Sequence, residues 1–367
     1  MKSEFYDKVA RQCVSGELLS TKTAADILSS DDIELLSLLN AAYAVRKKFV
    51  GKEVTIHIIN NAQNGHCCED CSYCAQAKPS KAEIKEYSLK SDREILLEAK
   101  NAHEHGAHRY CMVFSGRGPS QKRIDHLVRL VREIKSQYPI EVCVSAGLLD
   151  KDKAQRLADA GLDRLNHNLN TSARHYPSVC TTHTYEDRLN TLQAARQAGL
   201  QLCSGVILGM GENNDDVIEM AYTLRELGAE SIPVNFFIPI EGTQLKKEPV
   251  LSPEYCLRAL CLFRFLNPKA EIRIAAGRER YLRNMEVMAL YPANSLFLDG
   301  YLNAKGASRA RTLQMIKDAG FTISSEYSLD ELIAAETSTS NTDDKDPSGE
   351  ITIKNLKDLR PELESSI

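Results

Sequence analysis

Hydrophobic and polar positions follow two different periods along this chain. Between residues 3 and 49, apolar residues recur at helical spacing in FYDKVARQCVSG, KTAADILSS and DIELLSLLNAAYAVRKKFV, which predicts a group of N-terminal helices. From residue 53 onward, short apolar runs alternate with longer amphipathic stretches, the pattern of repeated parallel β-α units. The predicted strands are 53–59, 109–116, 140–147, 164–169, 201–209, 231–238, 271–277 and 294–300.

Eight strands, each followed by enough chain for a helix, favour a (β/α)8 barrel of the TIM type over an open doubly wound sheet. We therefore expect N-terminal helices over residues 1–50, a barrel over 51–321, and a C-terminal helix with a flexible tail over 322–367. The tail prediction rests on AAETSTSNTDDKDPSGE at 334–350, a stretch too poor in apolar residues to fold by itself.

Composition narrows the class of protein further. The 367 residues are 43% hydrophobic, which suits a globular enzyme with a substantial core. The net charge of -4 gives no basic surplus of the kind that nucleic-acid binding requires. We see neither a signal peptide nor a membrane span, so the sequence predicts a cytoplasmic protein that acts on small molecules.

The eleven cysteines carry the candidate chemistry, and four of them fall within HCCEDCSYC at 66–74, directly after the first predicted strand. An odd number of cysteines in a reducing compartment favours metal ligation over disulfides. In a barrel of this type, the loops that follow the strands form the mouth where chemistry occurs. The sequence therefore places this cysteine loop at the mouth of the barrel.

Three metal sites compete for the loop. Structural zinc needs a second ligand pair, and none follows. A ferredoxin-like run starting at Cys68 would continue with a cysteine and a proline, but position 78 is Lys78. The third register is Cys67-x3-Cys71-x2-Cys74, in which three thiolates bind three irons of a 4Fe-4S cluster and leave the fourth iron open to another ligand.

The third register, with Tyr73 before its last cysteine, resembles the signature of the radical S-adenosylmethionine (SAM) enzymes. In that superfamily SAM chelates the open iron, and an electron from the cluster releases a deoxyadenosyl radical. The resemblance therefore implies a 4Fe-4S cluster on Cys67, Cys71 and Cys74, with Tyr73 close to SAM and Cys68 as a thiol that binds no metal.

A second group of candidate ligands lies inside the predicted strands. Cys111, Cys143 and Cys203 each fall within one strand, and Arg273 is the third residue of EIRIAAG in another. A single buried cysteine usually packs as a small hydrophobe. An arginine inside a barrel, however, is costly unless it is paired or acts as a ligand, so the four residues together indicate a buried anionic group such as a second iron-sulfur cluster.

From residue 50 to residue 321 the chain is similar to the biotin synthase family. The matching stretches are EDCSYCAQ, RYCM, NHNLNTS, TTHTYEDRL, CSGVILGMGE, SIPVNF, IRIAAGRE and ANSLF. The resemblance implies a 2Fe-2S cluster on Cys111, Cys143, Cys203 and Arg273, and it makes Cys203 and Arg273 catalytic residues. It also implies the reaction: radicals from two SAM molecules remove hydrogen atoms from two carbons of dethiobiotin, and sulfur from the second cluster bridges them to give biotin.

The same resemblance assigns further residues to SAM and to the substrate. Its other implied SAM-binding residues are Asn168, Asn170, Arg188 and Ile207, and its substrate-binding residues are Asn168, Asn235 and Asn303. An amide both donates and accepts hydrogen bonds, which suits the urea group of dethiobiotin. Two departures concern the substrate: GTQL stands at 242–245 where relatives have GTPL, and Asn303-Ala304 replaces a Thr-Thr pair near the substrate carboxylate.

Other functions remain open at this point. Enzymes of hydrogenase maturation and methylornithine synthesis share the barrel and the three-cysteine loop, but they are not expected to have the second ligand set. A barrel that binds iron or zinc only structurally is the alternative from another class. Gly209-Met210-Gly211 begins a dinucleotide fingerprint, but Asn214 stands where the third glycine belongs. The family resemblance also implies an electron donor such as flavodoxin or ferredoxin, and a homodimer.

Overall fold

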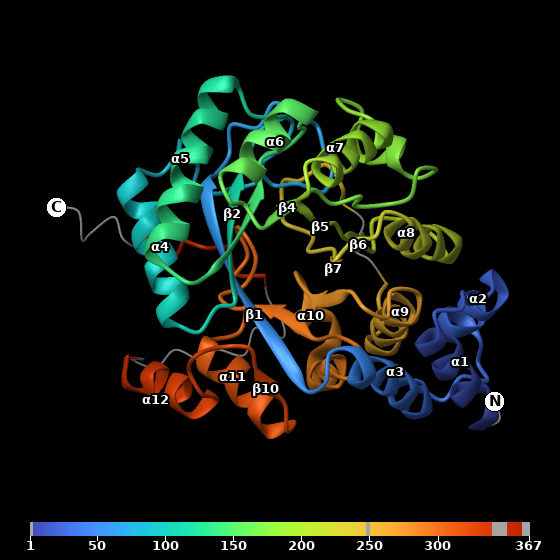
Figure 1. The fold of residues 1–367 in the computed structure, drawn as a ribbon. Coiled ribbons are helices and arrows are strands. Elements are labelled where there is room, and N and C mark those ends of the chain that lie inside the picture. The colour runs from blue at the N-terminus through green and yellow to red at the C-terminus, as the bar shows by residue number, and fades with distance from the viewer. Residues whose placement is uncertain (1–2, 247–249, 340–350, 362–367) are drawn as a thin grey trace.

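A closed parallel barrel forms the body of the protein in the computed structural model, which describes residues 3–246, 250–339 and 351–361 (Figure 1). Its strands run in the order β1-β2-β3-β4-β5-β7-β8-β9, and parallel pairing of β1 with β9 closes the circle. The strands are β1 (Glu53–Gln63), β2 (Arg109–Phe114), β3 (Glu141–Ser145), β4 (Arg164–Asn166), β5 (Gln201–Cys203), β6 (Val206–Leu208), β7 (Ser231–Phe236), β8 (Glu271–Ile274), β9 (Ser295–Phe297) and β10 (Thr322–Ile323). The predicted (β/α)8 fold is confirmed.

Helices surround the barrel, and each long helix that follows a strand begins at a side chain that caps it. Ser91, for example, accepts from the backbone N–H of Glu94, whose carboxylate accepts from the N–H of Ser91, a capping box. The helices are α1 (Ser3–Ser15), α2 (Thr21–Ser29), α3 (Leu35–Phe49), α4 (Asp92–Glu104), α5 (Gln121–Gln137), α6 (Lys151–Asp159), α7 (Tyr185–Gln197), α8 (Asn214–Glu226), α9 (Pro253–Leu266), α10 (Arg278–Leu282), α11 (Arg309–Asp318), α12 (Leu329–Thr339) and α13 (Leu356–Leu359), with short 3-10 helices at Tyr176–Ser178 and Arg283–Leu290.

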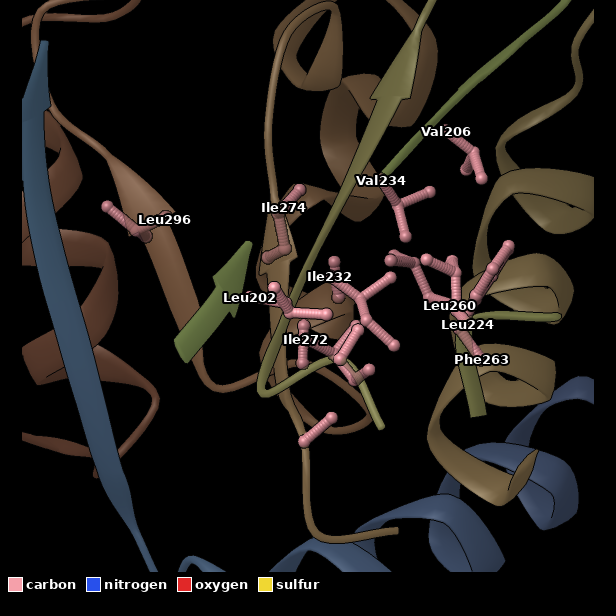
Figure 2. Close-up of a cluster of buried hydrophobic side chains, with 14 of the residues drawn as sticks. Leu202, Val206, Leu224, Ile232, Val234, Leu260, Phe263, Ile272, Ile274 and Leu296 are labelled. Atoms are coloured by element: carbon pink, nitrogen blue, oxygen red, sulfur yellow. The ribbon is translucent and has the colours of Figure 1, made fainter. Parts of the chain in front are cut away.

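Each barrel strand has one face toward the apolar core and the other toward the lumen, which holds the candidate functional side chains. Because successive side chains of a strand point to opposite faces, Ile272 and Ile274 of β8 point outward, whereas Glu271 and Arg273 point into the lumen. Figure 2 shows such outward side chains of the strands packed against Leu260 and other residues of the outer helices. The apolar core of the protein therefore lies between barrel and helices, which leaves the lumen for polar and sulfur-containing side chains.

The fifth predicted strand, 201–209, is interrupted in the structure. It consists of β5 and β6, separated by Ser204 and Gly205. A Cβ atom added to Gly205 would lie 2.0 Å from the carbonyl oxygen of Pro233, so only glycine permits β7 to pass this closely. Cys203 lies in the lumen at the end of β5, and Ile207 of β6 lines the mouth cavity.

The N-terminal helices confirm the predicted helical segment and lie together beside α9 (Figure 1). Arg46 of α3 is fully buried, and its guanidinium donates to the carbonyl oxygens of Ala293, Gly51 and Glu53 at 2.9, 2.6 and 2.7 Å. A buried cation needs such partners, and these three tie the helices to the barrel.

The C-terminal region contains a helix, α12, within residues 322–367, where the sequence predicts a helix followed by a flexible tail. After α11 the chain adds β10 next to β1 and then forms α12. Residues 351–361 are not free, because they pair with the barrel mouth and include the buried side chain of Leu359. Most of the Ser/Thr/Asp-rich stretch, residues 340–350, lies outside the described residues. Among the helices that are described, none is both long and apolar enough to cross a membrane.

Candidate active site

A cavity of about 290 Å³ opens at the carboxyl ends of the strands, where barrels of this fold carry their chemistry. Its wall includes residues from the loop after β1, from the ends of β4, β6 and β7, and from the loop after β9. The wall of this cavity contains all the residues that were predicted from the sequence to bind the first cluster, SAM or the substrate. These are Cys67, Cys71, Tyr73, Cys74, Asn168, Asn170, Arg188, Ile207, Asn235 and Asn303.

The cysteine loop is fixed by backbone and carboxylate hydrogen bonds. The N–H of Ser72 donates to the carbonyl of Val179 at 2.9 Å. The Asp70 carboxylate accepts from the backbone N–H groups of Thr181 and Thr182 at 3.0 and 3.2 Å. Burial opposes the charge of Asp70, but these hydrogen bonds hold its pKa well below the usual value. The loop that carries the three cysteines is thereby held against the segment that precedes α7.

That segment brings a further thiol and an imidazole to the cysteine loop. Cys180 Sγ lies 3.7 Å from Cys71 Sγ and 3.4 Å from His183 Nδ1, and the potential ligand atoms of all three residues lie within 4.8 Å of one another. His183 also contacts the carboxylate of Glu69. The sequence analysis missed Cys180 and His183, because a cysteine and a histidine more than 100 positions from Cys71 give no spacing signal.

Burial governs the chemistry of the loop thiols. It raises the pKa of the Cys74 thiol to about 11 and also raises that of Cys67. A cysteine must be a thiolate to ligate a metal, so any metal that these residues bound would displace their protons. Thiols that face one cavity suit an iron-sulfur cluster, because the positive charge of its iron atoms stabilises the thiolates that burial alone disfavours.

Tyr73 and Asn170 meet at one side of the cavity. The Asn170 amide donates to the Tyr73 hydroxyl at 2.7 Å, and Tyr73 and Ile207 both pack against a small buried apolar cluster that includes Phe237. Asn170 has a φ of 68°, a left-handed conformation that asparagine tolerates better than most residues. Asn170 therefore adopts the backbone conformation that the turn requires and also donates the hydrogen bond to Tyr73.

Asn168 and Arg188 form the neighbouring wall. Asn168 Oδ1 accepts from the N–H of Gly205 at 3.0 Å, and its backbone carbonyl accepts from Arg188 Nη1 at 2.8 Å. Arg188 also donates to the hydroxyl of Tyr176 and contacts His183 Nε2 at 2.8 Å. With 8% of its surface exposed, this arginine is not an ordinary solvated helix residue but part of the cavity wall.

The two other predicted substrate residues are held by different partners. Asn235 donates to the carbonyl of Val206 at 2.9 Å and accepts from the N–H of Ala276 at 3.2 Å. Asn303 forms a reciprocal pair with the side-chain amide of Asn64, at 2.7 and 3.1 Å. An amide has two N–H donors, so Asn303 keeps one donor beyond this pair.

The start of a dinucleotide fingerprint at Gly209-Met210-Gly211 does not bind a phosphate. The Glu212 carboxylate accepts from the backbone N–H groups of Gly209 and Met210, at 2.6 and 2.8 Å. A carboxylate in this position takes the donors that a pyrophosphate would need.

Deeper in the lumen, the second predicted ligand set meets at one point. Cys111, Cys143 and Cys203 form a buried cluster with Phe297, and Cys111 is paired with Cys143 in the register of β2 and β3. A hydrogen bond from Cys143, together with the charge of Arg273, holds the pKa of Cys203 well below its usual value. The strands thus bring together three sulfur atoms from distant parts of the sequence.

Arg273 faces these sulfur atoms with one end of its guanidinium. Its Nε donates to Ser295 Oγ at 3.1 Å, and its Nη2 donates to Ser231 Oγ at 2.8 Å and contacts the Glu271 carboxylate. Nη1 lies 3.7 Å from Cys203 Sγ. The other two nitrogens are thus occupied by oxygen partners, and Nη1 is the atom that faces the three thiols.

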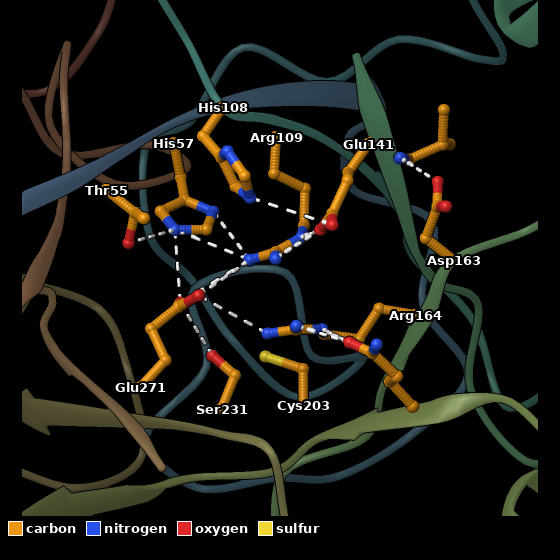
Figure 3. A network of polar contacts seen from close by, with 12 residues as sticks. Thr55, His57, His108, Arg109, Glu141, Asp163, Arg164, Cys203, Ser231 and Glu271 are labelled. Carbon is orange, nitrogen blue, oxygen red and sulfur yellow. Dashed lines mark hydrogen bonds and ion pairs between the residues drawn. The ribbon is translucent and has the colours of Figure 1, made fainter. Parts of the chain in front are cut away.

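A layer of buried charges closes the lumen below the thiols (Figure 3). The Glu271 carboxylate lies at its centre, 3.1 Å from both Arg109 Nη1 and His57 Nε2, and 3.4 Å from Arg164 Nη1. Burial works against its charge, but the surrounding cations hold its pKa well below the usual value. Burial and the charge of Arg273 lower the pKa of His57, although the Glu271 carboxylate opposes this shift. The lumen therefore has more cations than carboxylates around the thiols, as an anionic group there requires.

Tyr301 connects the two thiol sets and was also missed by the sequence analysis. It lines the mouth cavity, packs against the lumen cysteines, and its ring lies edge-on to Phe297 at 5.5 Å. Its place in the loop after β9 could not be read from a periodic pattern.

A parallel barrel with Cys67-x3-Cys71-x2-Cys74 in the loop after its first strand defines a radical SAM enzyme, and residues 64–224 match the model of the Radical SAM superfamily. Residues 233–322 match the Biotin and Thiamin Synthesis associated domain. The chain is 58% identical to the biotin synthase of Magnetococcus marinus over 85% of this chain and 98% of that protein. It is 54% identical to the biotin synthase of Acaryochloris marina over 86% of this chain and 91% of that protein. The chain belongs to the biotin synthase family, whose members are radical SAM sulfurtransferases.

Solved structures of two relatives confirm the fold. Methylornithine synthase superposes with a TM-score of 0.75 at 21% identity, covering 89% of this chain and 99% of that one. The FeFe-hydrogenase maturase HydG from Carboxydothermus hydrogenoformans gives 0.74 at 21% identity, covering 89% and 80%. These are the alternatives that the sequence left open. At this identity they establish the barrel alone, while the far more similar relatives establish the family.

Proposed function

We propose that this protein converts dethiobiotin to biotin by inserting one sulfur atom between two saturated carbons. The observation that carries the proposal is the presence of two separate thiol sets in one barrel, one at the mouth cavity and one in the lumen below it, with Tyr301 lining the cavity and packing against the lumen set. A reaction that generates a radical and also donates sulfur needs two such sites. Membership of the biotin synthase family supports the same substrate.

We assign Cys67, Cys71 and Cys74 to a 4Fe-4S cluster, and the lumen set to a 2Fe-2S cluster. The lumen set is Cys111, Cys143, Cys203 and Arg273. The residues fit these groups, because each set presents three sulfur atoms to one space and the lumen set adds one guanidinium nitrogen. When bound, the first cluster with SAM supplies the radical that removes hydrogen atoms, and the second supplies sulfur.

The chain itself supplies orientation and exclusion of water. We propose that Tyr73, Asn170, Arg188 and Ile207 hold SAM, that Asn168 lies between SAM and the substrate, and that Asn235 contacts the substrate urea. The Nδ2 group of Asn168 has no acceptor among the described residues, which leaves it available for a ligand carbonyl. A cavity enclosed by these side chains keeps a reactive radical away from solvent.

Asn303 is the proposed contact for the substrate carboxylate, with one amide N–H left after its pairing with Asn64. The electron donor, such as flavodoxin or ferredoxin, and the homodimer remain predictions from the family resemblance.

The sulfur source provides the first test of the proposal. Protein reconstituted with iron and heavy-isotope sulfide should yield biotin that carries the heavy isotope, because the proposed donor is the second cluster. Mass spectrometry of the product measures this, with unlabelled sulfide as the control. Unlabelled biotin from fully labelled protein would contradict sulfur donation by the second cluster.

The Arg273→Lys variant tests the geometry of the lumen site. Lysine keeps the charge but has a single nitrogen, which cannot reach Ser295, Ser231 and the thiols together. We expect the protein to lose most of its 2Fe-2S cluster and to keep its 4Fe-4S cluster, as measured by iron and sulfide content and by absorbance spectra. Arg164→Lys is the matched control, because Arg164 contacts Glu271 without touching a thiol. Equal cluster content in Arg273→Lys and unmodified protein would remove Arg273 from the ligand set.

A further inference from the structure

The last described segment of the chain, residues 351–361, returns to the barrel mouth. It lies outside both matched family regions, residues 64–224 and residues 233–322. In Figure 1 the last coloured stretch of the chain reaches α4, apart from α12. We call residues 351–361 the C-terminal strap.

The strap forms a β-bridge with the loop after β9. In that loop Tyr301 and Ala304 exchange both backbone hydrogen bonds, at 3.0 and 2.9 Å, which closes a tight hairpin. Ile353 then pairs with Ala304 in antiparallel orientation. The N–H of Lys354 donates to the carbonyl of Asn303 at 2.8 Å, and the N–H of Lys305 donates to the carbonyl of Thr352 at 2.9 Å. The strap therefore fixes the backbone on both sides of Ala304.

Several side chains fasten the strap to the rest of the barrel. Arg360 donates two hydrogen bonds to the Glu94 carboxylate of α4, both at 2.8 Å. Burial of Glu94 opposes its charge, but the bond from Arg360 lowers its pKa to about 2, so the pair is ionised at neutral pH. Asp358 pairs with Lys305 at 2.9 Å, and the Leu359 side chain is 4% exposed. A bidentate ion pair and a buried leucine make this a docked segment.

The loop under the strap is also a wall of the mouth cavity, to which Tyr301, Leu302, Asn303 and Ala304 all contribute. Leu302 has a φ of 46°, a left-handed conformation that is unfavourable for leucine. Such a conformation persists only where the surrounding structure holds it. The strap provides part of that support.

We propose that the C-terminal strap is a positioning element for the substrate: it holds the 301–305 loop, and with it Asn303, in the shape that receives the carboxylate end of dethiobiotin. This inference rests on the proposed function. The strap acts through the loop and does not itself touch the reacting atoms.

Two truncations test the strap directly. A chain that ends at residue 350 lacks it, whereas a chain that ends at residue 361 keeps it and serves as the control. Leu359→Asp and Leu356→Asp form a second matched pair, because both leucines lie in α13 but Leu356 is 41% exposed. We expect the chain ending at 350 and Leu359→Asp to lose hydrogen-exchange protection at the Lys305 amide in the metal-free protein. Their KM for dethiobiotin should rise by about tenfold, the effect of loosening one hydrogen-bonding wall residue.

The controls should behave as the full chain in both measurements. Unchanged amide protection without the strap would overturn the structural half of the proposal, and lost protection with an unchanged KM would overturn its functional half. If the full chain makes no biotin at all, the proposed function fails instead, while the exchange measurement still reports on the strap.

Discussion

Replacement of Cys71 by alanine should reduce SAM cleavage to background. Cys71 is one of only three thiols in the Cys67-x3-Cys71-x2-Cys74 register, and its side chain is buried at the mouth cavity. A cluster with three protein ligands cannot lose one and keep the same open iron, so the loss should exceed the roughly 10- to 100-fold cost of removing an outer-sphere partner of a metal. Deoxyadenosine formed under reducing, anaerobic conditions is the quantity to measure.

Cys68→Ala is the matched control for this prediction. Cys68 is exposed and next to Cys67 in the sequence, and its thiol donates to the carboxylate of Glu69 at 3.5 Å. We expect this variant to retain iron and to cleave SAM at the rate of the unmodified protein. The opposite outcome, an inactive Cys68→Ala and an active Cys67→Ala, would replace Cys67 by Cys68 in the proposed ligand set.

Replacement of Cys143 by alanine should separate the two halves of the reaction. Cys143 lies in the lumen between Cys111 and Cys203, away from the thiols of the mouth. The variant should therefore still form deoxyadenosine but should produce no biotin, because the proposed sulfur donor has lost a ligand. Both products can be quantified in the same sample by mass spectrometry.

Cys261→Ala provides the comparison. Cys261 is as deeply buried as Cys143, but it packs in α9 among apolar side chains of the outer core, where a cysteine acts as a small hydrophobe. We expect it to make biotin normally. Biotin from Cys143→Ala at the level of Cys261→Ala would exclude Cys143 from the sulfur-donating site.

Much of the fold could be predicted because a β/α barrel has a strong periodic signal. Outward residues such as Ile272 and Ile274 alternate with Glu271 and Arg273. The sequence of a single strand therefore predicts which side chains pack against the outer helices and which polar side chains face the lumen. The break at Gly205 could not be predicted, since it depends on how closely β7 passes. A run of apolar residues gives no sign of a neighbouring carbonyl.

The site was predictable where chemistry lies in short motifs and not where it depends on distant loops. The two thiol sets followed from spacing and from an arginine that would be costly in an apolar lumen. Cys180, His183 and Tyr301 come from loops with no periodic pattern, and Glu271 becomes meaningful only when Arg109 and Arg164 are seen around it. The docking of the C-terminal strap could not be predicted either, because it depends on one buried leucine, on two ion pairs and on backbone hydrogen bonds with residues far away in the sequence.

The most direct test of the account is product analysis of the full chain, reconstituted anaerobically with iron and sulfide and supplied with a reductant, SAM and dethiobiotin. We expect this mixture to form both biotin and deoxyadenosine. Deoxyadenosine without biotin, from protein that holds both clusters, would contradict dethiobiotin as the substrate.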